Sequence, residues 1–211
     1  MRDKPLMLSM LVMIIVSGLA TISVVLVQQP VRTASTGIAD SESTSKDSIK
    51  TVTQQIAKLE IQRAMLEPVF TADASIIEKI ESELERLRRR LSQVQPDGNQ
   101  AAVNHAVFEA IKAKIAELEV KRALLEPVFT SEAPVMQKID SQIGSLSQRI
   151  AKIQPDNKLA VNDAVSEAIK AKITELKAKR SLEATQDSST SPNLASIDSK
   201  LKSLEKRLVG R

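Results

Sequence analysis

The sequence predicts an all-α protein in which an N-terminal transmembrane helix precedes three tandem antiparallel helical hairpins of the coiled-coil type. The 211 residues include three Phe, five Gly and no Trp or Tyr, whereas compact mixed folds use aromatic residues in the core and Gly in tight turns. One long apolar run opens the chain. The remainder repeats itself, and in each copy the apolar residues are spaced alternately three and four apart, as in heptad repeats.

The apolar run begins at Leu6, ends at Val27 and contains 22 residues without a charge. A helix of that length spans about 33 Å, which is enough for a hydrocarbon core of about 30 Å. Arg2 and Lys4 precede the run, and this charge bias favours an N-terminus inside and the bulk of the chain outside the cytoplasm. We expect residues 1–27 to be an uncleaved signal anchor. A cleaved signal peptide is the alternative.

The chain after the apolar run is a polar tether followed by three repeats. The tether is rich in Ser and Thr and has no hydrophobic period, so we expect it to be flexible. IAKLEIQRAMLEPVFT from Ile56 recurs as IAELEVKRALLEPVFT from Ile115 and, in part, as ITELKAKRSLEA from Ile173. Such repetition indicates serial helical units. The expected segments are the tether at 28–47 and hairpin repeats at 48–97, 98–156 and, in degenerate form, 157–211.

Each repeat is interrupted, in the first two copies by the identical sequence LEPVFT. Proline inside a helix removes a hydrogen bond and clashes with the preceding turn, at a cost of about 3 kcal/mol. Just beyond the break, Pro134 and Pro192 align with Ser75, and proline suits the first position of a new helix; Ser75 with Glu78 would form a capping box if the start shifted by one residue. These signals favour a helical hairpin.

A kinked continuous helix is the alternative at these breaks. Phe70 and Phe129 continue the heptad phase across LEPVFT, as they would if the helix ran on. We treat both residues as candidates for interaction with a partner.

The second break and the residues after it resemble a known hairpin. LEPVFTSEAPVMQKIDSQIGSL is similar to the coiled-coil hairpin tip of polysaccharide chain-length-determinant and exopolysaccharide-transport proteins. The similarity runs through Phe129, Thr130, Pro134, Met136, Ile139, Ile143 and Leu146. Those proteins also have a second membrane helix and a mixed α/β domain, which we do not expect here. The resemblance therefore implies an envelope location and a hairpin tip rather than a transport activity.

Three arginines, Arg63, Arg122 and Arg180, occupy a core heptad position among Ile and Leu. A polar residue in the seam can fix the register of packed helices. Alternatively, the apolar stem packs in the seam while the guanidinium reaches Glu67 or Glu126 one turn further on.

A second apolar stripe lies on the first helix of each repeat, opposite the heptad seam and near the break. Residues four apart share one face of a helix, so the stripe predicts contact between hairpins of one chain or between chains. Single exposed apolar residues are the alternative. The stripe consists of Ile61 and Met65, then Val120 and Leu124, then Ala178 and Leu182.

Composition argues against several functions. The 30 basic residues are interleaved with 26 acidic ones, and aromatic residues for stacking on bases are lacking, so we expect no nucleic-acid partner. With one His, no Cys and no recognised catalytic motif, we expect no enzyme and no catalytic, cofactor or metal site.

The sequence favours a non-enzymatic, membrane-anchored coiled-coil protein in the periplasm or a lumen. It would act as a structural scaffold or interaction rod of the cell envelope, binding a protein partner or itself through helical faces. An accessory component of polysaccharide synthesis or export, or a secretion adaptor, is the alternative.

Overall fold

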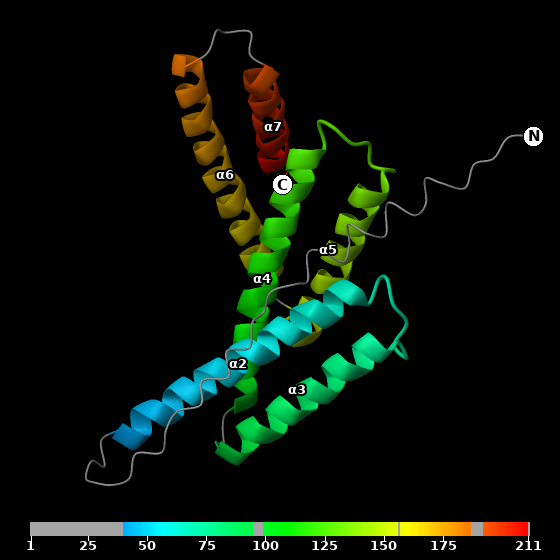
Figure 1. Ribbon diagram of the computed structural model, residues 1–211, viewed down its shortest axis with the longest axis vertical. Helices are drawn as coiled ribbons and strands as arrows, with labels where there is room; N and C mark the ends of the chain where they lie inside the picture. The colour runs from blue at the N-terminus through cyan, green and yellow to red at the C-terminus, as the bar shows by residue number, and fades with distance from the viewer. Residues whose placement is uncertain (1–39, 95–98, 156, 187–191, 211) are drawn as a thin grey trace, which may run out of the picture. The chain divides into compact units, whose positions relative to one another are not determined.

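The computed structural model describes residues 40–94, 99–155, 157–186 and 192–210. These residues form six α-helices and no β-strand, which confirms the all-α prediction (Figure 1). The predicted membrane anchor lies outside them, and none of the six helices carries an apolar stretch long enough to cross a membrane. The helices are α2 (Asp40–Leu66), α3 (Ser75–Val94), α4 (Asn99–Leu125), α5 (Pro134–Ile153), α6 (Lys158–Gln186) and α7 (Pro192–Val209).

Helix α2 begins earlier than the tether prediction allowed, since residues 40–47 are helical. This segment contains neither Pro nor Gly, the residues that most disfavour a helix. A polar composition without hydrophobic period therefore did not prevent the segment from extending the helix that follows it.

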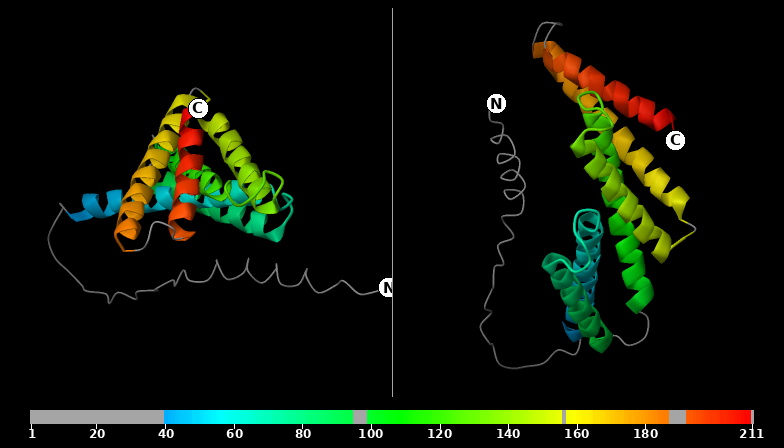
Figure 2. Two further views of the ribbon diagram at one scale, coloured as in Figure 1. Left: turned by 90° about the horizontal axis from the view of Figure 1, so that it is seen from above. Right: turned by 90° about the vertical axis from the view of Figure 1, so that its right-hand side faces the viewer.

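The six helices pair as three antiparallel hairpins: α2 with α3, α4 with α5, and α6 with α7 (Figures 1 and 2). Ion pairs across each hairpin show the reversal, because they join residues 18 apart in sequence: Arg63 with Glu81, Arg122 with Asp140, and Arg180 with Asp198. On one continuous helix such residues would lie about 27 Å apart. The chain therefore turns back at each break.

The two LEPVFT breaks have the same backbone hydrogen bonds. The amides of Val69 and Phe70 both donate to the carbonyl of Leu66, at 2.9 Å, and the equivalent amides of the second break donate to Leu125 at the same distance. The carbonyl of Ala74 accepts the amides of the first turn of α3, which makes Ala74, not Ser75, the capping residue. The capping box suggested for Ser75 therefore does not start α3. Ser75 instead occupies the first helical position, where α5 and α7 have Pro134 and Pro192.

The hairpins pack on one another mainly through their first helices. Helix α4 contacts both α2 and α6, and each later hairpin also places its second helix against the preceding first helix, α5 on α2 and α7 on α4 (Figure 1). One hydrophobic cluster runs through all three hairpins and contains the heptad residues Ile56, Ile115 and Ile173. The fold thus resembles the nearest-neighbour packing of helical repeat proteins.

Candidate interaction surfaces

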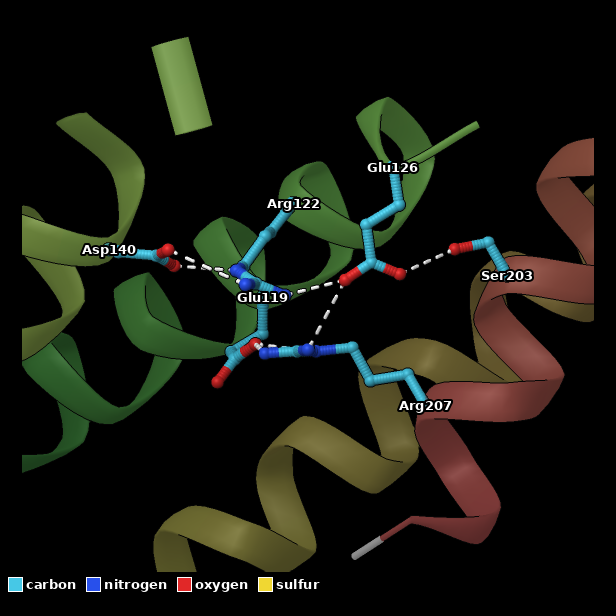
Figure 3. A network of polar contacts seen from close by, with 6 residues as sticks. All are labelled: Glu119, Arg122, Glu126, Asp140, Ser203 and Arg207. Carbon is cyan, nitrogen blue, oxygen red and sulfur yellow. Dashed lines mark hydrogen bonds and ion pairs between the residues drawn. The ribbon is translucent and has the colours of Figure 1, made fainter. Parts of the chain in front are cut away.

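Each hairpin is clamped by the arginine that the heptad pattern placed in the seam. In the second hairpin, Arg122 Nε lies 2.5 Å from Asp140 Oδ1, and Nη1 lies 2.5 Å from Glu126 Oε1 (Figure 3). The hydrogen bond to Asp140 raises the pKa of Arg122 above its ordinary value. The stem is held near the seam while the guanidinium reaches acidic groups at its edge, as expected for a snorkelling arginine.

The equivalent arginines of the other hairpins make similar ion pairs, but their side chains are exposed to different degrees. Arg63 contacts Glu67 at 3.2 Å and Glu81 at 2.8 Å, and Arg180 contacts Asp198 at 2.5 Å. The Arg180 side chain is 53% exposed, against 18% for Arg122. The expected contacts to Glu67 and Glu126 form, but the acid on the second helix was not anticipated because its position depends on the register of the hairpin.

An ion pair with a buried glutamate joins each hairpin to the next. Glu60 of α2 is 1% exposed and accepts a hydrogen bond from Arg149 of α5 at 2.7 Å and one from Arg88 of its own hairpin at 2.5 Å. Glu119 of α4 is 7% exposed and accepts from Arg207 Nε of α7 at 2.8 Å (Figure 3). The glutamates occupy equivalent positions in the repeats, and so do the arginines of the following hairpins. We call these contacts the inter-hairpin ion pairs.

A serine contact accompanies each inter-hairpin ion pair. Ser203 Oγ donates to Glu126 Oε2 at 2.9 Å, and the equivalent Ser145 Oγ donates to Glu67 Oε2 at 3.3 Å. Glu126 also lies 3.4 Å from Arg207, so one carboxylate connects the clamp within the second hairpin to the contact with the third (Figure 3). The same polar interface is thus built twice along the chain.

Small residues surround these glutamates on the docked faces of α2 and α4. Ala57 and Ala64, and their equivalents Ala116 and Ala123, are at most 5% exposed. Alanine at these positions lets neighbouring helix backbones come close around the buried glutamates, while the arginines that bind them keep 24–48% of their side chains exposed. A charge removed from water in this way is stable only with its partner present.

The predicted second stripe contributes to this interface in two hairpins only. Ile61 and Met65 line a groove that Ala106 and Ala110 of α4 complete. The stripe residues of the first two hairpins are half-buried against the core: Ile61, Met65, Val120 and Leu124. Ala178 and Leu182 of the third are exposed, Leu182 by 64%. In the first two hairpins the stripe thus packs against neighbouring hairpins of the same chain, and Glu60 and Glu119, which the sequence did not single out, are buried beside it.

The tips of the first two hairpins present apolar side chains to solvent. Phe70 is 43% exposed and Phe129 is 42% exposed, and each is preceded by an exposed valine, Val69 or Val128. They leave the seam because the helices end at Leu66 and Leu125, before the heptad phase reaches them. Exposed aromatic residues next to other apolar side chains are frequent at protein–protein contacts.

A carboxylate in each tip is held by the turn. A hydrogen bond from the Thr71 hydroxyl, and one from its own backbone amide, lower the pKa of Asp73. At the equivalent place, its own backbone amide, then Ser131 and Thr130, lower the pKa of Glu132. In both turns the carboxylate is thus lowered in pKa by its own backbone amide and by the threonine of LEPVFT, with Ser131 adding to the effect in the second.

Within the described parts of the chain, no three His, Cys, Asp or Glu side chains are grouped as metal ligands. Searches against known proteins add no relative: no family model, no curated protein and no solved structure matches this chain.

Proposed function

We propose that this protein is a non-enzymatic scaffold of the cell envelope. In this proposal residues 6–27 anchor it in the membrane, the hairpins lie outside the cytoplasm, and the tips bind a protein partner. The observation that carries the proposal is the pair of identical, exposed apolar tips on an array whose other large apolar side chains are mostly buried. Covering such a patch removes apolar surface from water, which favours association.

The two tips should bind the same structural element of a partner protein. They share the sequence LEPVFT and the same backbone hydrogen bonds, and the hairpins that carry them are joined by the ion pair of the buried Glu60 with Arg149. A partner with two copies of its binding element would gain from engaging both tips, because the second contact would form at high effective concentration.

Photocrosslinking in native membranes tests this proposal. A photoreactive residue would replace Val69 or Val128, and the matched control would carry it at Leu182, an exposed position outside the tips. We expect both tip probes to capture the same partner protein and the control probe to capture much less. Phe70→Ser combined with Phe129→Ser should remove the capture. Equal capture from Leu182 would contradict a binding role for the tips.

Topology is tested separately. A reporter that is active only outside the cytoplasm, fused after Arg211, should be active, because the charges before Leu6 favour an N-terminus inside. Activity of only a cytoplasmic reporter at that position would overturn the envelope location.

An accessory role in polysaccharide synthesis or export is the second candidate. The similarity of residues 125–146 to the hairpin tip of chain-length-determinant proteins favours it. Synthesis or export proteins among the partners captured from Val69 and Val128 would support this role over a general scaffold.

A further inference from the structure

The side of the third hairpin that corresponds to the docking faces of the first two carries different residues. The inter-hairpin glutamates Glu60 and Glu119 are replaced by Lys177, and the serine-binding glutamates Glu67 and Glu126 by Ala184. Lys177 is 60% exposed in its side chain. A further hairpin docking here would bring an arginine equivalent to Arg207 against a cation, which is unfavourable.

The charge is reversed as a pair rather than at one position. In the first hairpin Glu60 of the first helix binds Arg88 of the second. At the same two positions of the third hairpin, Lys177 lies 3.3 Å from Glu205. The hairpin therefore retains an internal ion pair while losing the acceptor for a neighbour.

The small apolar residues of the docking face are also replaced. Thr174 and Ser181 stand where the first hairpins have buried alanines, and both are exposed. Their hydroxyls donate to carbonyls of their own helix, Lys170 at 3.0 Å and Lys177 at 3.1 Å. This face thus satisfies its polar groups without a partner.

We propose that the third hairpin is the terminal cap of the array, and that Lys177, Ala184, Thr174 and Ser181 exclude docking of a further hairpin of this type. The excluded hairpin could belong to a longer chain or to a second copy. Repeat arrays need such polar terminal faces to stay soluble and of defined length. The chain then does not extend end to end, and its partners bind elsewhere. This inference does not depend on the function proposed above.

Val165 provides a position that reports docking. Its side chain is fully buried, yet in the register set by Arg180 and Asp198 it lies beyond the end of α7 at Val209. The other helix packed extensively on α6 is α4, so burial of Val165 depends on the second hairpin. Because the chain has no cysteine, Val165→Cys gives a single thiol whose labelling rate measures docking.

The test uses the full chain lengthened by one hairpin, with a copy of residues 154–211 following Arg211. That junction keeps the repeat register, because Arg211 aligns with Ile153. The cysteine replaces the residue equivalent to Val165 in the added hairpin. A second lengthened chain restores the docking face with Lys177→Glu, Glu205→Arg, Ala184→Glu, Thr174→Ala and Ser181→Ala. As a control for folding, the cysteine is placed at Val165 itself in each chain.

When the added hairpin follows the natural third hairpin, we expect its thiol to be labelled rapidly. When it follows the restored docking face, we expect the labelling rate to be at least about tenfold lower, as for a site that opens only by local undocking. Protection behind the natural hairpin would overturn the proposal. Rapid labelling in both chains, with the Val165 control protected, would also overturn it, since the five positions would then not decide docking.

The reciprocal variant keeps the natural length. Ala116→Thr, Glu119→Lys, Ala123→Ser and Glu126→Ala transfer the cap residues to the second hairpin. The thiol at Val165→Cys should then label at least tenfold faster than in the chain without these changes. An unchanged rate would show that these residues do not exclude a neighbour.

Discussion

At the scale of single residues, the inter-hairpin ion pairs are the contacts on which the account depends most. Sequence analysis placed Arg63, Arg122 and Arg180 at core heptad positions, whereas their side chains are 31%, 18% and 53% exposed. It missed Glu60 and Glu119, because a glutamate outside the seam is normally exposed, and only the docking of the next hairpin buries it. A usable signal was present: alanines seven residues apart surround each glutamate, and both features disappear together in the third repeat.

A double-mutant cycle should detect the inter-hairpin pair. Combining Glu119→Gln with Arg207→Ala should reveal a coupling of about 1–3 kcal/mol in the free energy of unfolding, as for contacting residues removed from solvent. The exposed pair of Glu167 with Lys170 is the matched control, with an expected coupling of about 0.5 kcal/mol or less. Urea denaturation measures both, and equal couplings would argue against a special role for the buried pair.

The tip carboxylates provide a second residue-scale prediction. Thr71→Val removes the main cause of the lowered pKa of Asp73, so that pKa should rise towards its ordinary value of 3.8, while the pKa of Glu132 stays unchanged. The lowered pKa of Asp73 stabilises the folded turn at a pH above the ordinary pKa of the group. This stabilisation is lost as the pH falls through the pKa of the folded state. Carboxyl NMR titration measures both groups. An unaltered Asp73 would show that Thr71 does not hold it.

At the scale of elements, the helix pairs follow from spacing and breaks. Apolar residues three and four apart, proline within LEPVFT and proline at the start of the next helix are local signals, which is why α5 and α7 begin at Pro134 and Pro192. The heptad phase of Phe70 and Phe129 was misleading, because phase continues in the sequence after a helix has ended. The start of α2 was missed because no apolar period marks residues 40–47.

Crosslinking within the third hairpin tests the reversal there. With Arg180→Cys and Asp198→Cys, a short bis-maleimide should join the two positions rapidly within one chain. The control pair, Leu159→Cys with Lys177→Cys, has the same separation of 18 residues but lies on one helix, where the positions are about 27 Å apart. Reaction of neither pair would favour a continuous helix, in which both pairs would lie about 27 Å apart.

The close approach of α4 to its neighbour is tested by enlarging a small residue. Ala123 is fully buried, and Ala123→Leu should lower the free energy of unfolding by about 1–3 kcal/mol through overpacking. Ser181→Leu, at the equivalent exposed position of α6, should change it by no more than about 0.5 kcal/mol. Thermal or urea unfolding compares the two variants, and similar effects would mean that Ala123 does not face a docked helix.

At the scale of the whole molecule, the array is a property that no single repeat determines. The sequence predicted the number of hairpins because the repeats align, and its second stripe indicated one docking face of the first two hairpins. The polar contacts across that face were not predicted, since they join residues far apart in the chain. Differences between repeats are informative here: Lys177 and Ala184 of the third repeat replace the glutamates that receive the next hairpin in the first two repeats. The predicted membrane anchor stays a prediction, because residues 1–39 lie outside the described structure.

The docking of successive hairpins is tested most directly by crosslinking Glu67→Cys with Ser145→Cys, positions whose natural side chains meet at 3.3 Å across the first two hairpins. A short thiol-specific crosslinker should join them within a single chain, and the equivalent pair, Glu126→Cys with Ser203→Cys, should behave alike. The pair Glu67→Cys with Ser203→Cys skips one hairpin and should not react. Efficient intramolecular crosslinking of both adjacent pairs, without the skipped pair, is the predicted result; no crosslink in either adjacent pair, or crosslinks only between chains, would contradict the docked array.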